Sequence, residues 1–124
     1  MSDVLRVSAL ARTKLTRNDV TLYEQAYSLD ETAFTELAAD RVVLATNMST
    51  PEQYNLGGIS NGAHVMIETD KPVLISFNGT TAQWQVGANN DGGVLMLANT
   101  SFTSIYFQNE STDNEVTAHV IAVE

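Results

Sequence analysis

The clearest pattern in the chain is a pair of alternating segments that meet at Asn78-Gly79, within residues 72–86. Asn-Gly suits a two-residue hairpin turn because both central positions of that turn need a positive φ. The turn would pair Val73 with Trp84 and place every second residue on one face. That face is apolar and consists of Val73, Ile75, Phe77, Ala82, Trp84 and Val86. The pattern therefore predicts a core hairpin with a buried tryptophan.

Alternation in the rest of the chain predicts further strands. Residues 4–15 alternate until the turn at Asn18-Asp19. Residues 21–29 follow as a second strand, although Leu22, Ala26 and Leu29 fit a helix nearly as well. The later predicted strands are 42–46, 53–56, 63–68, 94–98, 103–108 and 116–123. A five-residue loop over 68–72 would join the 63–68 strand to the core hairpin, with Ile67 opposite Val73. The last strand is apolar on both faces, which is typical of an interior strand.

Eight or nine short strands at regular spacing predict an all-β fold, an antiparallel β-sandwich or a jelly-roll-like barrel. We expect a single β domain over residues 1–124, with 1–17 as a basic strand or arm and 41–124 as the core sandwich. One segment stays open. Ser28 to Glu31 has the form of a capping box, so residues 30–39 form either one short helix or an extended, irregular passage.

The charge is uneven along the chain, which carries a net −9. Residues 1–17 carry +3, from Arg6, Arg12, Lys14 and Arg17 against Asp3. The remaining residues carry −12, an acidity that argues against a nucleic-acid partner. The basic segment is either a charged edge strand that resists edge-to-edge pairing, or an arm that lies on the acidic body of a neighbouring copy or another acidic protein.

Little in the sequence points to catalysis. The chain has no cysteine, which excludes disulfides and thiolate chemistry. The two histidines, His64 and His119, read as surface or core residues, although the members of a triad meet only in three dimensions. The oxygen-rich segment 89–93 lacks the spacing of a calcium loop and reads as a turn. We therefore expect no enzyme activity, no cofactor and no metal.

A surplus of large apolar side chains falls outside the best core faces. These residues are Tyr23, Tyr27, Tyr54, Met66, Leu74 and Tyr106. They are either buried locally or form a subunit interface, where aromatic residues and methionine are enriched. The candidate partner-binding residues are Arg6, Arg12, Lys14, Arg17, Tyr23 and Tyr27.

Residues 60–124 resemble small virion structural proteins of tailed bacteriophages, a group of capsid decoration or head accessory proteins. The resemblance lies in four segments, Glu68 to Asn78, Val94 to Leu97, Asn99 to Asn109 and Val116 to Val123. It implies a β-sandwich that binds the major capsid protein and copies of itself, with a homotrimer favoured. It also implies assembly in the bacterial host cytoplasm and a final location in the virion.

Other functions stay open at this point. A phage tail or spike module that binds host-surface glycan would use Trp84 and the tyrosines as stacking platforms. A small hydrolase would use His64 or His119. We expect no membrane partner, because no apolar run approaches the length of a membrane span and the amino terminus has none of the kind found in export signals.

Overall fold

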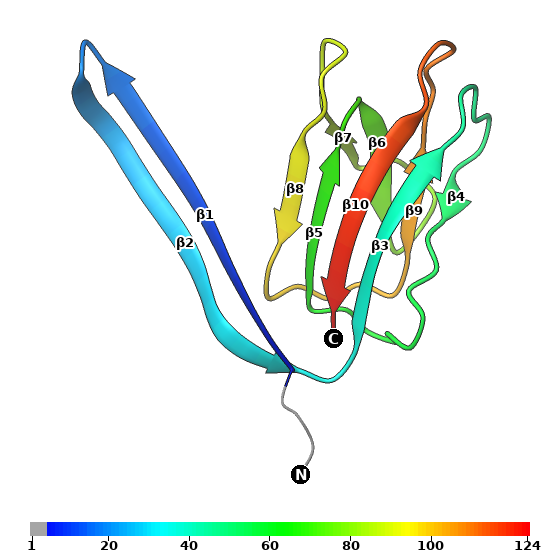
Figure 1. The fold of residues 1–124 in the computed structure, drawn as a ribbon, viewed down its shortest axis with the longest axis horizontal. Helices are drawn as coiled ribbons and strands as arrows, with labels where there is room; N and C mark the ends of the chain where they lie inside the picture. The colour runs from blue at the N-terminus through cyan, green and yellow to red at the C-terminus, as the bar shows by residue number, and fades with distance from the viewer. Residues whose placement is uncertain (1–4) are drawn as a thin grey trace. The chain divides into compact units, whose positions relative to one another are not determined.

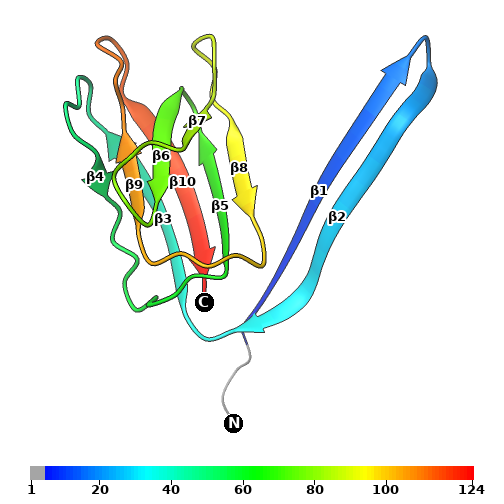
Figure 2. The same ribbon diagram turned by 180° about the vertical axis from the view of Figure 1, so that it is seen from behind.

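The computed structural model describes the backbone of residues 5–124 and the side chains of residues 6, 8, 10–28 and 35–124. Residues 1–4, which include the predicted start of the first strand and Asp3, lie outside this part. The described chain is all-β, with ten strands in antiparallel sheets and no helix. It divides into two compact units, residues 1–35 and 36–124, and each is described by itself (Figures 1 and 2).

The first unit is one long hairpin of β1 (Leu5–Arg17) and β2 (Val20–Phe34). The turn between them is Asn18-Asp19, and both residues have a positive φ, 50° and 65°. This is the backbone geometry that matches a two-residue turn to the twist of the flanking strands. The predicted turn is confirmed, and β2 is longer than the predicted strand over 21–29.

The second unit is a sandwich of two four-stranded sheets, so the barrel alternative is wrong. The first sheet has the order β3-β10-β5-β8 and the second sheet has the order β4-β9-β6-β7. The strands of the first sheet are β3 (Leu37–Leu44), β5 (His64–Thr69), β8 (Val94–Leu97) and β10 (Val116–Val123). Those of the second sheet are β4 (Glu52–Gln53), β6 (Val73–Phe77), β7 (Trp84–Val86) and β9 (Ile105–Gln108).

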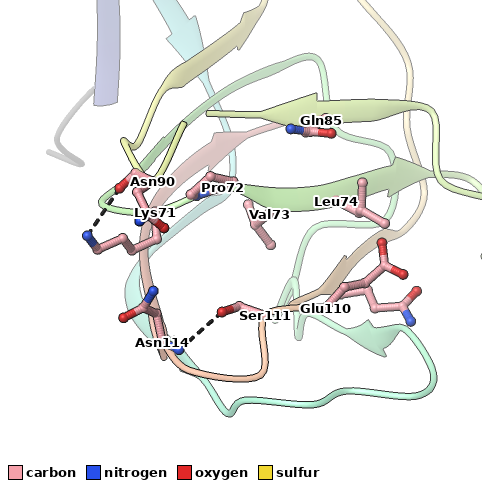
Figure 3. Close-up of a pocket in the computed structure, with 10 residues that line it drawn as sticks. Lys71, Pro72, Val73, Leu74, Gln85, Asn90, Glu110, Ser111 and Asn114 are labelled. Atoms are coloured by element: carbon pink, nitrogen blue, oxygen red, sulfur yellow. Dashed lines mark hydrogen bonds between the residues drawn. The ribbon is translucent and has the colours of Figure 1, made fainter. Parts of the chain in front are cut away.

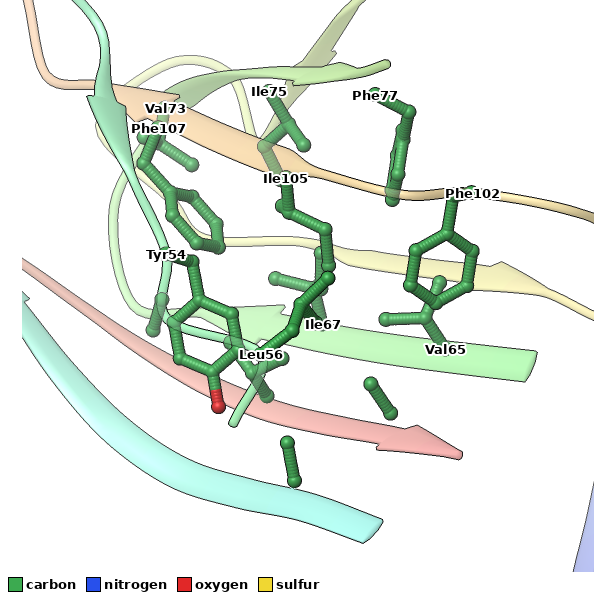
Figure 4. Packing of buried hydrophobic residues seen from close by; sticks show 14 of the residues in the cluster. Tyr54, Leu56, Val65, Ile67, Val73, Ile75, Phe77, Phe102, Ile105 and Phe107 are labelled. Atoms are coloured by element: carbon green, nitrogen blue, oxygen red, sulfur yellow. The ribbon is translucent and has the colours of Figure 1, made fainter. Parts of the chain in front are cut away.

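The core lies between these two sheets (Figure 4). The first sheet contributes Val65, Ile67, Val120 and neighbours, and the second contributes Val73, Ile75, Ile105 and Phe107. Tyr54 meets the ring of Phe107 edge to face, with the ring centres 6.2 Å apart. β10 runs between β3 and β5, which confirms that the last strand is interior. The sandwich begins at β3, a few residues before the predicted boundary at residue 41.

The central hairpin exists, but its predicted turn and register are wrong. Val73 pairs with Val86 and Ile75 with Trp84, a shift of two residues that keeps each side chain on its predicted face. Residues 78–83 form the loop. The Asn78 side-chain oxygen accepts a hydrogen bond from the Thr103 backbone N–H (2.6 Å), and the Asn78 backbone N–H donates to Ser104 O (3.0 Å). These bonds hold Asn78 against the chain entering β9. Asn78 has a positive φ of 60°, but Gly79 lacks the positive φ that the second position of the tight turn needs.

The predicted burial of Trp84 is also wrong, since the side chain is 46% exposed. Trp84 begins the three-residue strand β7, which lies at the edge of its sheet. Its partner Ile75 is fully buried because β6 has neighbours on both sides. The Trp84 side chain therefore faces inward, but a short edge strand leaves its indole only partly covered.

The predicted pairing of the 63–68 strand with the core hairpin is wrong as well. β5 pairs with β10 and β8, whereas β6 belongs to the opposite sheet. Asp70 marks the crossing, where its backbone N–H and carboxylate bond to Thr117 O (3.1 Å) and Thr117 N (2.8 Å). Ile67 and Val73 both point into the core, but from facing sheets.

The helix alternative for residues 30–39 is wrong. β2 continues to Phe34, and its last residues pair with residues 5–7 of β1. Leu37 then begins β3, which pairs with β10 along its whole length. Both halves of the segment therefore use their backbone groups in sheets, which outweighs the local capping signal.

The Glu124 side chain ties the end of the sandwich to the loop at Ser60. Its carboxylate accepts hydrogen bonds from Ser60 Oγ (2.8 Å), Ser60 N (3.1 Å) and Asn61 N (3.3 Å). The bonds from Ser60 hold the pKa of Glu124 below its ordinary value of 4.5. The stabilisation from this contact is therefore present above that value and is lost as the pH falls through the lowered pKa.

Ser60→Ala is expected to raise the Glu124 pKa toward 4.5, because it removes the largest cause of the shift. Carboxyl-carbon NMR titration of the wild type and the variant measures this midpoint directly. Ser49→Ala, at an exposed position, is the matched control and should leave the titration unchanged. An unchanged titration midpoint of Glu124 in the Ser60→Ala variant would contradict the contact.

Candidate functional site

The most unusual feature of the protein is the β1-β2 hairpin, which we call the arm. Its strands of 13 and 15 residues pair with each other and with no other strand of the described chain. A two-stranded hairpin is at best marginally stable in water unless it packs against something. Both long edges of the arm also carry unpaired backbone groups, which are templates for contact with other chains.

The arm has two different faces. Between residues 10 and 28, the strand register places alternate residues on opposite sides. The aromatic face comprises Ala11, Thr13, Leu15, Tyr23, Gln25 and Tyr27, and the charged face comprises Leu10, Arg12, Lys14, Glu24, Ala26 and Ser28. On the aromatic face, Leu15 lies opposite Tyr23 and Ala11 lies opposite Tyr27.

Large apolar side chains of the arm are exposed. They are 42% to 68% accessible to solvent and comprise Leu10, Leu15, Val20, Leu22, Tyr23 and Tyr27. Four of the six lie within residues 15–23, around the turn. A soluble protein rarely leaves such a cluster uncovered unless it contacts a partner. Alternation over residues 4–15 did predict a strand, but it could not show that no strand other than β2 pairs with it.

The six predicted partner-binding residues all lie on the arm, but not on one surface. Arg6, Arg12 and Lys14 lie on the charged side of β1, whereas Tyr23 and Tyr27 lie on the aromatic face. Arg17 alternates to the aromatic side, next to the turn. Arg12 forms an ion pair with Glu24, and the Tyr23 hydroxyl donates to the Gln25 side chain. The basic character of the charged face is therefore partly offset by β2.

A second exposed apolar surface lies on the sandwich, on the outer side of the first sheet. The strand register aligns four apolar residues across all four strands, and we call them the apolar row: Ala39, Ile121, Met66 and Met96. Ile121 is 43% exposed and Met66 is 37% exposed. Exposed Leu37 and Val94 lie near its two ends, on β3 and β8. Of this surface, sequence reasoning singled out only Met66.

The other members of the apolar surplus are divided between core and surface. Tyr54 is buried and donates a hydrogen bond to Asp40 Oδ2 (2.5 Å). Burial, and then the contact with Asp40, raise the pKa of Tyr54 above its ordinary value. Leu74 and Tyr106 are partly exposed on the second sheet.

The two histidines do not converge. Both lie on the outer side of the first sheet, where His119 is opposite Glu68 and His64 is four residues before Glu68 on β5. This spacing separates the imidazoles by roughly 13 Å or more along the strands. His64 Nδ1 accepts a hydrogen bond from the Asn99 backbone (3.0 Å). The geometry therefore does not bring the two side chains to a common reacting atom.

The oxygen-rich segment 89–93 is a tight turn. Asn89 and Asn90 both have a positive φ, and Ala88 and Asp91 exchange backbone hydrogen bonds of 3.1 and 2.9 Å around them. Gly92 lies so close to β5 that a Cβ there would be 1.7 Å from Thr69 O. The positive φ angles and the close approach at Gly92 thus explain why asparagine and glycine occupy this segment. Among the residues that the structure describes, no group of three acidic or histidine side chains could hold a metal ion.

The sandwich also has a shallow hollow of about 260 Å³ between the start of β6 and the loop after β9 (Figure 3). Its charged lining residues are Lys71 and Glu110. The Lys71 ammonium donates to Asn90 O (3.1 Å), and Ser111 Oγ accepts from Asn114 N (3.1 Å). The hollow has the polar walls of a surface groove, and its polar groups hold the surrounding loops together.

No helix in the described part of the chain is long and apolar enough to cross a membrane. Comparisons with protein-family models, with curated proteins and with solved structures give no match.

Proposed function

We propose that this chain is a non-enzymatic structural protein of a tailed-bacteriophage virion, where it binds the capsid lattice and copies of itself. The observation that carries the proposal is the arm, a two-stranded element with exposed aromatic and aliphatic side chains and no neighbouring strand in the described chain. Such an element gains stability only when another surface covers it. This favours a function performed through protein–protein contact.

The identity of the partner in this proposal comes from the resemblance of residues 60–124 to phage head accessory proteins. The charge of the two units is compatible with it. β1 carries four basic residues and no acidic one, and the turn and β2 carry four acidic residues, Asp19, Glu24, Asp30 and Glu31. Residues 36–124 carry two basic and ten acidic residues, a net −8. An acidic body keeps free subunits apart in solution, and a basic strand attracts acidic surfaces.

The proposal predicts that purified virions of the phage that encodes the chain contain it in many copies. Quantitative mass spectrometry of particles washed in high salt measures the copy number relative to the major capsid protein. Incorporation should fall at least tenfold for a chain carrying Tyr23→Ser and Tyr27→Ser, while Gln85→Glu on the sandwich serves as the matched control. Particles that lack the wild-type chain would contradict the virion assignment.

A second candidate function has one observation in its favour. The exposure of Trp84 makes the indole available as a stacking platform, as a glycan-binding module of a phage tail or spike requires. Since Trp84 is the only tryptophan, its fluorescence reports on this site alone. A saturable emission shift on adding host-surface glycan, abolished by Trp84→Ala, would favour the glycan function. An unchanged emission spectrum leaves the structural function as the better proposal.

A further inference from the structure

We propose that the aromatic face of the arm in one copy docks on the apolar row of the first sheet in a second copy. This inference rests on the proposed function and names the self-contact within it. The two surfaces have matching chemistry. Each is exposed and apolar, one presents Leu15 with two tyrosines, and the other presents Ile121 with two methionines. Aromatic residues and methionine are the types enriched at protein interfaces.

The length of the arm favours docking between two molecules. Only residues 35 and 36 connect β2 to β3. β2 has 15 residues, which span about 50 Å, whereas β3 has 8 residues and spans about 26 Å. An arm folded back on its own first sheet would extend well past the end of the strands. The exposed apolar residues around the turn, such as Leu22 and Tyr23, would stay uncovered.

Charge favours the arm over a second sandwich as the occupant of the apolar row. Joining two sandwiches through these faces would bring together two bodies that each carry a net −8. The arm carries four basic and four acidic residues over 5–34, a net charge of zero, so docking it on an acidic body does not bring two like-charged bodies together. Like charges on opposing surfaces oppose association, so the arm meets less repulsion than a second sandwich would. A heterologous contact of this kind also lets each copy give one arm and accept another, as a ring requires.

The absence of native cysteine allows a direct test with single-cysteine chains. Thr13→Cys places a thiol in the centre of the aromatic face, and Ala39→Cys places one in the apolar row. The two variants, given different tags, are mixed and treated with a short bis-maleimide. We expect a cross-linked product that contains both tags. Ala26→Cys, on the charged face directly opposite Arg12, is the matched control and should give at least tenfold less of this product.

Two further measurements test whether the cross-link depends on the apolar row and whether it forms between molecules. Ile121→Glu in the Ala39→Cys chain should reduce the mixed product at least tenfold, whereas Gln85→Glu on the second sheet should not change it. A chain carrying both cysteines should cross-link between molecules and not within one. Equal yields from Thr13→Cys and Ala26→Cys, a product formed only within one chain, or no product at all would each overturn the inference. Virion incorporation, measured separately, would still decide the proposed function.

Discussion

Phe102→Ala is expected to lower the free energy of unfolding of the sandwich by about 3–5 kcal/mol. The Phe102 side chain is 1% exposed, and its ring packs on Phe77 with the ring centres 5.6 Å apart. Its backbone also exchanges hydrogen bonds with Gly62 (2.7 and 3.1 Å), which joins the entry of β5 to the segment before β9. A domain of this size has a total stability on the order of 5–13 kcal/mol, so this loss is a large part of it.

Urea unfolding followed by circular dichroism measures the effect of Phe102→Ala. Ser49→Ala, at an exposed position outside the strands, is the control and should change the stability by less than about 0.5 kcal/mol. The neighbouring glycine provides a sharper check. A Cβ on Gly62 would lie 2.1 Å from the Phe102 ring, so Gly62→Ala alone should cost about 1–3 kcal/mol.

In the Phe102→Ala background that clash disappears, and the cost of Gly62→Ala should largely disappear with it. The double variant should therefore be more stable than the sum of the single effects by about 1 kcal/mol or more. Strictly additive effects of the two substitutions would show that Gly62 and Phe102 are not in contact.

The second large effect is expected at Asn109, the most buried polar residue of the sandwich. Its side-chain amide donates to Ala45 O (3.0 Å) and Asn114 O (2.8 Å), and its side-chain oxygen accepts from Ser111 N (3.0 Å). Asn109→Ala removes three bonds and leaves their partners without the amide. We expect a loss of about 2–4 kcal/mol in the free energy of unfolding, measured by urea titration.

Asn109→Asp keeps the bond that the side-chain oxygen accepts and removes the two bonds that the amide donates. The new carboxyl can still accept from Ser111 N, but in its charged form it faces two carbonyl oxygens. Burial and these carbonyls raise its folded-state pKa above that of the unfolded chain. Its stabilisation is therefore present below the unfolded pKa and is lost as the pH rises through the folded pKa. The stability deficit relative to wild type should shrink between pH 7 and pH 4, and a deficit independent of pH would contradict the network.

Local patterns in the sequence were enough to predict an all-β fold, with the sandwich as one of two alternatives, the turn at Asn18-Asp19 and the interior position of β10. These features depend on local patterns that the fold preserves. The pattern did not predict which strands pair with each other in one sheet. Ile67 and Val73 both face inward, and alternation cannot distinguish strands of one sheet from strands of facing sheets. Asn78 is held by contacts with Thr103 and Ser104, 25 residues or more away in sequence, which no local turn rule contains.

The layout of the predicted partner-binding residues could not be read from the sequence. The basic residues and tyrosines near the amino terminus all lie on the arm. Their division between two faces depends on the register with β2, because Arg12 and Lys14 alternate with Ala11 and Leu15, the residues opposite Tyr27 and Tyr23. The apolar row joins residues from four distant strands, and only the sheet order aligns Ala39 with Met96. No single segment of the sequence could therefore predict this surface.

The most direct test of the account is amide hydrogen exchange of the full-length protein over a range of concentrations. The sandwich has its own core, so its amides should stay protected at every dilution. If a second copy holds the arm, as we propose, residues 10–28 should be protected at high concentration and should exchange rapidly when the protein is dilute. Arm amides with the same protection at all concentrations would contradict the claim that another molecule holds the arm.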